Sequence, residues 1–287
     1  MKKVFLTLAL LMGVFSVADD LQVEMEKKFK KYGSYQEAAN AFREQCKSGK
    51  MSSCYALGYM YDNGKGIPQD KTKAFKLYTK VCDANGKRGC TNLGIMYFKG
   101  EGVEQDRFKA VELYKKACEI GEAWGCTSYG IAFYRGEGAD KDPVVASKYF
   151  KLGCDGGSAW GCGKLAELYA KGEGVDKNIF IAVKLFDKAC KEGNLNGCID
   201  LGLMYEAGEG AKQDKAMAVE LYKKACEGNI ARGCNNLAYM YYEGEGIQQN
   251  KQKAKEIYGK SCELQDEKGC KNFKRINEDK YIPSYQR

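Results

Sequence analysis

The chain has 287 residues, of which 44% are hydrophobic and 29% are charged, and its formal net charge is +8. The positive charge is spread over the whole chain and forms no concentrated stripe, so it indicates solvated helix faces and argues against a nucleic-acid site. The sequence contains no histidine, which excludes the side chain most used for proton transfer near neutral pH and in histidine-based zinc sites.

The N-terminus has the pattern of a secretory signal peptide, which we assign to residues 1–18. Lys2 and Lys3 precede an apolar stretch, 4–15, and small residues at 16–18 offer a cleavage site after Ala18. The apolar stretch is short for a membrane span, although an uncleaved N-terminal anchor is the alternative. We therefore expect a secreted or periplasmic protein whose mature chain has no membrane span.

The fourteen cysteines form seven pairs that repeat every 36 residues, and the second member of each pair lies eight positions after the first. A fixed period of this length is typical of a stacked repeat array, and fourteen thiols in an exported protein favour disulfides. Because every repeat is expected to adopt the same local structure, the period favours a disulfide between the two members of each pair. Zinc is the alternative, which the absence of histidine and of closely spaced Cys-x-x-Cys pairs disfavours. The expected disulfides are Cys46–Cys54, Cys82–Cys90, Cys118–Cys126, Cys154–Cys162, Cys190–Cys198, Cys226–Cys234 and Cys262–Cys270.

One repeat is predicted to be a pair of helices joined by a glycine turn. Residues 89–98 carry apolar side chains at helical spacing, and residues 99–105 interrupt that pattern with two glycines. Asp106 suits the N-cap of a second helix, and Gly121 suits its C-terminal end. Such a pair cannot bury its apolar face alone, so the repeats must stack into an all-α solenoid.

Both ends of the array differ from the repeat consensus, as terminal repeats usually do. We expect a helix pair over residues 21–32 and 34–48 at the start, and a single capping helix over about 268–279 at the end. The solenoid is predicted to occupy residues 19–280 in about seven repeats, followed by a flexible tail, 281–287.

The repeat resembles the Sel-one-like repeat family, a relative of the tetratricopeptide repeats. The motif that carries the resemblance is Leu-Gly-x-Met-Tyr-x-x-Gly-x-Gly-Val over residues 93–103, followed by Asp106, Lys109-Ala110, Leu113-Tyr114 and Ala117. The Cys-x7-Cys pair behind a signal peptide is similar to the cysteine-rich Helicobacter (Hcp) subfamily. This resemblance implies a right-handed superhelical solenoid whose repeats are joined by disulfides, and a protein that is secreted or periplasmic.

The subfamily resemblance also implies penicillin binding or weak β-lactamase activity. The sequence has no Ser-x-x-Lys motif, and Lys71-Thr72-Lys73 only partly matches Lys-Thr-Gly. Zinc-dependent hydrolysis would need histidine ligands. We therefore assign no catalytic residue, metal or cofactor, and keep β-lactam or peptidoglycan-like binding as the alternative function. An envelope structural or regulatory role is a further alternative.

The favoured function is a binding scaffold for a protein or an extended peptide, such as a host or envelope protein. By analogy with tetratricopeptide arrays, the first helix of each repeat lines a concave face through positions equivalent to 52, 55, 56, 59, 62 and 63. These positions vary between repeats and include aromatic and arginine residues, which are favoured as interface anchors. They also include asparagines, whose amides can either hydrogen-bond to the backbone of a bound peptide or simply face solvent. We expect a monomer. The predicted binding residues are Tyr55, Tyr59, Arg88, Asn92, Phe98, Trp124, Tyr134, Arg135, Trp160, Arg232, Asn236, Tyr239, Tyr242 and Asn272.

Overall fold

The computed structural model describes Phe29 and residues 31–281. The expected signal peptide, its cleavage site and residues 282–287 of the predicted tail lie outside this part of the chain. The predicted helix over residues 21–32 falls almost entirely outside it as well.

The described part of the chain is all-α, with no strand, and divides into two compact units between Gly156 and Gly157. The first unit contains α2 (Tyr35–Lys47), α3 (Met51–Asn63), α4 (Lys71–Asp83), α5 (Lys87–Lys99), α6 (Arg107–Glu119), α7 (Ala123–Arg135) and α8 (Pro143–Asp155). The second contains α9 (Ala159–Lys171), α10 (Ile179–Lys191), α11 (Leu195–Ala207), α12 (Lys215–Glu227), α13 (Ala231–Glu243), α14 (Lys251–Glu263) and α15 (Glu267–Asn277). Among the described helices, none is both long and apolar enough to cross a membrane.

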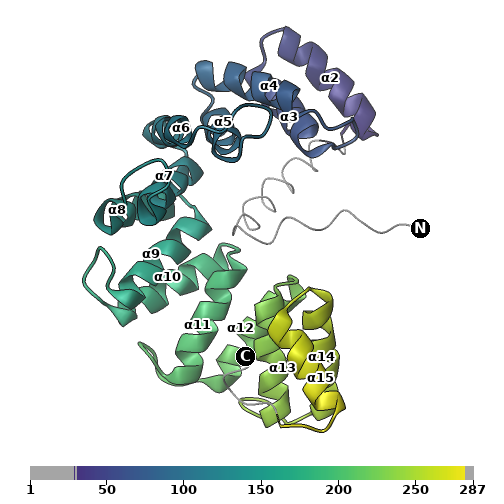
Figure 1. Cartoon of the computed structure of the whole chain (residues 1–287), viewed down its shortest axis with the longest axis vertical. Helices are drawn as coiled ribbons and strands as arrows, with labels where there is room; N and C mark the ends of the chain where they lie inside the picture. Colours follow the sequence, from purple (N-terminus) through teal and green to yellow (C-terminus); the bar gives the residue numbers. More distant parts are fainter. Residues whose placement is uncertain (1–28, 30, 282–287) are drawn as a thin grey trace. The chain divides into compact units, whose positions relative to one another are not determined.

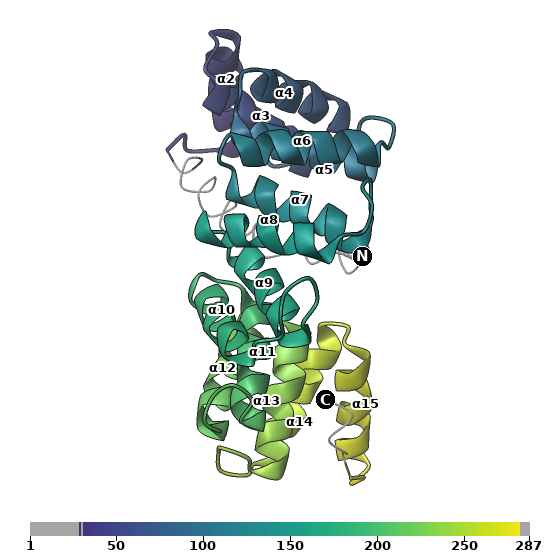
Figure 2. The same ribbon diagram turned by 90° about the vertical axis from the view of Figure 1, so that its left-hand side faces the viewer.

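Odd-numbered helices from α3 onward, the A helices, alternate with even-numbered B helices. Each A helix from α3 to α13 packs against the B helix that follows it, and within each unit A helices also contact the A helix of the next repeat, as α5 does with α7 and α13 with α15. Figures 1 and 2 show the α5–α6 pair beside the α7–α8 pair. The predicted solenoid of stacked helix pairs is confirmed.

The ends of the helices follow from local sequence. Asp106 accepts a hydrogen bond from the Lys109 N–H at 2.9 Å and caps α6, and Asp or Asn does the same at the start of every B helix from α4 onward. The A helix α5 ends at Gly100, which has a φ of 72°. The predicted helix over 34–48 is α2 with its caps Ser34 and Ser48.

The A and B helices of a repeat approach closely because small residues lie where they cross. A Cβ at Gly94 of α5 would lie 2.7 Å from Cε1 of Tyr114 and 3.2 Å from the Ala110 carbonyl oxygen in α6. Ala110 is fully buried and Tyr114 is 6% exposed. The aromatic ring therefore fills the space that the glycine leaves.

Six of the predicted disulfides are present with the predicted pairing, at S–S distances of 1.96–2.05 Å. Cys154 and Cys162 are also disulfide-bonded, and no cysteine is free. Each of the six bridges joins the end of a B helix to the start of the next A helix, and so fixes the turn between repeats. Disulfides rather than zinc sites therefore account for the cysteine pattern.

A lysine from the next repeat reinforces four of these turns. Lys116 donates from Nζ to the Cys82 carbonyl oxygen at 3.0 Å, and Lys224 donates to that of Cys190 at 2.9 Å. Lys80 and Lys260 make the same bond to the preceding repeat. The ammonium group thus meets carbonyls at the C-terminal end of a helix, where a positive charge is stabilising.

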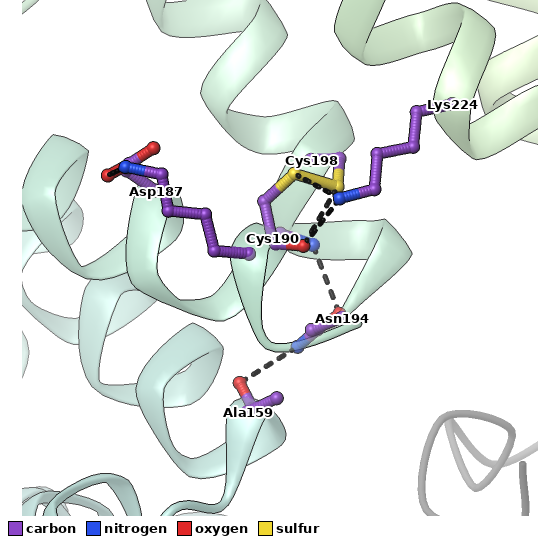
Figure 3. The surroundings of a disulfide bond; sticks show 8 residues. Ala159, Asp187, Cys190, Asn194, Cys198 and Lys224 are labelled. Carbon is purple, nitrogen blue, oxygen red and sulfur yellow. Dashed lines mark hydrogen bonds and ion pairs between the residues drawn. A yellow bond between two sulfur atoms is a disulfide. The ribbon is translucent and has the colours of Figure 1, made fainter. Parts of the chain in front are cut away.

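Figure 3 shows one such turn in the second unit. Lys224 reaches the Cys190 carbonyl beside the Cys190–Cys198 disulfide, and Asn194 caps α11 by accepting from Gly197 N–H at 3.1 Å. The Asn194 amide also donates to the Ala159 carbonyl oxygen at 3.2 Å. The turn between repeats is therefore held by a covalent bond and by three hydrogen bonds.

Candidate functional site

The candidate site is the helix-A face, which we define as the side chains at the repeat positions equivalent to 52, 55, 56, 59, 62 and 63. All fourteen predicted binding residues occupy positions of this face, and the structure distributes them over three degrees of exposure. Six are buried, five are partly exposed and three are exposed. The buried residues are Tyr55, Tyr59, Asn236, Tyr239, Tyr242 and Asn272. The partly exposed residues are Asn92, Phe98, Trp124, Tyr134 and Trp160. The exposed residues are Arg88, Arg135 and Arg232.

The second residue of each A helix is the most consistently accessible position of this face. None of its seven members is buried. Both tryptophans of the chain are among them, each partly exposed. The position carries Ser52, Arg88, Trp124, Trp160, Asn196, Arg232 and Lys268.

The asparagine column links consecutive repeats. Asn92 donates from Nδ2 to the Tyr55 hydroxyl at 3.3 Å, and Asn272 donates to Asn235 Oδ1 at 3.1 Å. Both bonds join one A helix to the preceding A helix, at a separation of 37 residues. Asn272 is fully buried, so it does not face solvent. These two amides therefore have a stacking role that sequence reasoning did not anticipate.

In the first unit, an acidic residue that sequence reasoning missed lies in the electrostatic field of Arg88. Burial raises the pKa of Glu122, while the neighbouring charges of Arg88 and Lys87 oppose that rise. Burial also raises the pKa of the Tyr55 hydroxyl, and Arg88 again opposes the shift. Arg88 thus influences groups on α3 and at the start of α7. Glu122 could have been found in the sequence, because it occupies the N-cap of α7.

In the second unit, charged and aromatic side chains form a polar network across α9, α11 and α13. Lys164 Nζ lies 5.9 Å from the Trp160 ring centroid and 2.7 Å from Glu167. Arg232 forms an ion pair with Asp200. Burial raises the pKa of Asp200, although the Arg232 charge opposes the shift.

Sequence reasoning found only the aromatic and arginine members of this network. Lys164 and Asp200 occupy the repeat position equivalent to 56, and Glu167 the position equivalent to 59. These three residues therefore lie on the predicted face, but they were not among the predicted binding residues, because only aromatic, arginine and asparagine side chains were selected.

A pocket of about 460 Å³ opens beside the C-terminal end of α11, where α12 begins and the turn after α13 approaches. It combines three carboxylates, one ammonium group and an apolar wall. Glu206 is 7% exposed, and its Oε2 accepts a hydrogen bond from the Tyr222 hydroxyl at 2.8 Å. We call this cavity the α11 pocket; it is lined by Leu203, Met204, Glu206, Ala207, Glu209, Gln213, Lys215, Tyr239 and Glu245.

Sequence reasoning identified one residue of the α11 pocket, Tyr239. Glu209 and Glu245 gave no signal because five of the six Gly-x-Gly turns carry glutamate between the two glycines. Neither in the α11 pocket nor elsewhere among the described residues is a group of three or more acidic, cysteine or histidine side chains arranged to hold a metal ion. The arrangement on the helix-A face suits non-covalent recognition through ion pairs, hydrogen bonds and aromatic contacts.

The repeated helix pairs and their stacking define an α-solenoid, and the comparisons with known proteins specify its class. The Sel1 repeat model matches six segments of the chain, 52–86, 87–122, 125–158, 161–194, 196–230 and 231–266. The chain belongs to the Sel1 repeat family. The resemblance to Sel-one-like repeats is therefore confirmed.

Several relatives share parts of the chain. A Sel1 repeat protein from Oxalobacter formigenes is 26% identical, with a TM-score of 0.76 over 84% of this chain and 98% of that one. A protective antigen of uropathogenic Escherichia coli strains is 26% identical, with a TM-score of 0.71 over 86% of this chain and 54% of that one. The cysteine rich protein B of Helicobacter pylori is 32% identical over 45% of this chain and 93% of that one, with a TM-score of 0.38.

One curated relative is an exopolysaccharide production negative regulator from Rhizobium leguminosarum bv. viciae. It is 40% identical over 55 residues, which make up 18% of this chain. The chain covers 21% of the length of that relative. The match therefore concerns a short stretch of repeats.

Proposed function

We propose that this protein is an exported binding scaffold that holds a partner protein or an extended peptide on its helix-A face. The observation that carries the proposal is the contrast between two sets of repeat positions. Positions that pack the repeats together are nearly constant and buried, for example the alanine column that includes Ala74, Ala110 and Ala182. The second position of each A helix is accessible and changes from repeat to repeat.

The residues at this accessible position have the chemistry of interface anchors. Tryptophan and arginine provide large contact areas and are enriched among residues that dominate binding energies. Lys164 approaches the Trp160 ring, and Asp200 pairs with Arg232, so these side chains are partly ordered before a partner arrives. Pre-ordering lowers the entropy lost on binding.

The disulfides support export and rigidity. Every cysteine is disulfide-bonded, and such bonds persist in oxidising compartments. A rigid stack presents a fixed set of side chains, which favours a binding role over one that needs a large conformational change. We infer that the protein acts in the periplasm or outside the cell.

Crosslinking followed by affinity purification from the native compartment tests this proposal. We expect partners captured by the unaltered protein to be lost or greatly reduced in the Trp124→Ala/Trp160→Ala variant. The matched control is Phe108→Ala/Phe180→Ala, which removes two aromatic side chains that are 75% and 70% exposed on B helices. Retention of every partner by the tryptophan variant would place the binding surface elsewhere. Turnover of a chromogenic cephalosporin by the purified protein would instead favour the β-lactam alternative.

A further inference from the structure

The α11 pocket deepens the proposed function, on which this inference rests. We propose that the pocket receives a basic side chain, arginine or lysine, from the bound partner segment. Its position supports this assignment, because Leu203, Glu206, Ala207 and Tyr239 occupy helix-A face positions equivalent to 59, 62, 63 and 59. A segment bound along that face would pass the mouth of the pocket.

The charges of the pocket favour a cation. Glu206, Glu209 and Glu245 contribute three carboxylates against the single ammonium group of Lys215, a formal excess of two negative charges. The whole chain carries +8, so a cationic group is attracted to this pocket while the remainder of the molecule repels it. Opposite charge at the contact and like charge elsewhere together guide a basic segment to one place.

The shape and lining of the pocket match a long side chain with a charged end. Its volume of about 460 Å³ lies within the usual range for ligand pockets. Leu203, Met204 and Ala207 offer an apolar wall for the methylene stem of arginine or lysine. The Tyr239 ring and the carboxylates can then contact the cationic end.

The equivalent place in the first unit shows what is special about the α11 pocket. There, Lys71 Nζ contacts both Asp62 at 2.6 Å and Glu101 at 2.8 Å, so one lysine balances two carboxylates. In the second unit, Lys215 Nζ lies 3.1 Å from Glu245. Glu206 accepts a hydrogen bond from the buried Tyr222 hydroxyl at 2.8 Å, and Asp62 accepts the equivalent bond from the Tyr78 hydroxyl at 3.4 Å. The difference between the two places is one of charge, because Glu209 of the α11 pocket occupies the repeat position of Lys65 in the first unit.

The test uses the oxidised, full mature protein with ¹³C-labelled methionine methyl groups. Met204 lines the pocket, and its methyl resonance can be assigned from a Met204→Leu variant. The probes are the peptide Gly-Gly-Arg-Gly-Gly and the same peptide with citrulline, which keeps the shape of arginine and lacks its charge. We expect the arginine peptide to shift the Met204 resonance, and to bind at least about tenfold more tightly than the citrulline peptide, because charge-assisted hydrogen bonds are the strong ones.

A variant and a matched control complete the test. Glu209→Gln/Glu245→Gln should weaken binding of the arginine peptide about tenfold, whereas Glu227→Gln, which removes an exposed charge at the end of α12, should leave it unchanged. If the double variant melts early, Glu209→Gln alone, at an exposed residue, carries the comparison. Equal binding of both peptides, a Met204 resonance that does not move, or unchanged affinity in the glutamine variants would each overturn the proposal.

This test separates the pocket from the scaffold function. A partner that binds the unaltered protein and the Glu209→Gln/Glu245→Gln variant equally well would refute the basic side chain in the pocket and leave the scaffold function intact. If the arginine peptide enters the pocket but the affinity purification captures no partner, the scaffold function is refuted and the binding of a basic side chain in the pocket is retained.

Discussion

Removal of one disulfide should loosen one turn of the solenoid by an amount that can be calculated in advance. Cys82–Cys90 closes a loop with a sequence separation of 8 between α4 and α5. In the chain-entropy model, opening a loop of this size costs about 2.5 kcal/mol of stability. Cys82 and Cys90 are 1% and 0% exposed, so Cys82→Ala/Cys90→Ala also loses the packing of their sulfur atoms, by about 1 to 1.5 kcal/mol in total.

The expected effect is local, because the repeats of a solenoid contact only their neighbours. We expect amides of α4 and α5 to exchange hydrogen at least about 60-fold faster in the variant, which is the loop-closure contribution of about 2.5 kcal/mol converted at about 1.4 kcal/mol per tenfold. Amides of α13 and α14 in the second unit should be unaffected. Hydrogen exchange followed by mass spectrometry of the oxidised proteins measures both regions. An acceleration below tenfold in α4 and α5, or an equal one in α13 and α14, would refute this reasoning.

Three further predictions concern contacts between repeats. Lys116→Met should lower the free energy of unfolding by about 1 kcal/mol, because it loses the bond to the preceding disulfide turn; Lys115→Met is the control, and equal effects in urea denaturation would contradict the prediction. Burial raises the pKa of Asp200 in the folded protein above its ordinary value of 3.8. The stability that this aspartate contributes therefore falls as pH rises from 3.8 through the folded pKa. Asp200→Asn removes this fall, so the slope of stability against pH should become more positive in that pH range. Unfolding measured across the acid range would show an unchanged slope if this is wrong. Asn235→Ala should cost about 1 to 3 kcal/mol, because it removes the acceptor of the buried Asn272 amide; thermal melts that match the unaltered protein would disprove this role.

The sequence alone predicted the repeat unit and the pairing of six described disulfides. Both depend on residues close together along the chain. Asp106 caps a helix three residues from its partner N–H, and Cys82 reaches Cys90 across a short turn. Such local geometry recurs every 36 residues, and the period therefore made it visible.

The accessibility of the candidate site was not visible in the same way. Tyr55 and Asn272 occupy the predicted face, yet both are buried against neighbouring repeats. Their contacts, Asn92 with Tyr55 and Asn272 with Asn235, join residues 37 positions apart. A repeat period indicates which residues share a position, but it does not indicate how closely two stacked helices cover it.

The α11 pocket shows what only the tertiary structure decided. In the sequence, Asp62 and Glu206 occupy one repeat position and differ by a single methylene group. In the folded chain, Asp62 pairs with Lys71 and accepts from Tyr78 at 3.4 Å, and Glu206 accepts from the equivalent Tyr222 at the shorter distance of 2.8 Å. The sequence by itself determined a disulfide-linked stack of helix pairs, because local turns and caps suffice to define it. The pocket and its charge depend on side chains that three different helices and their turns bring together, and only packing brings them into contact.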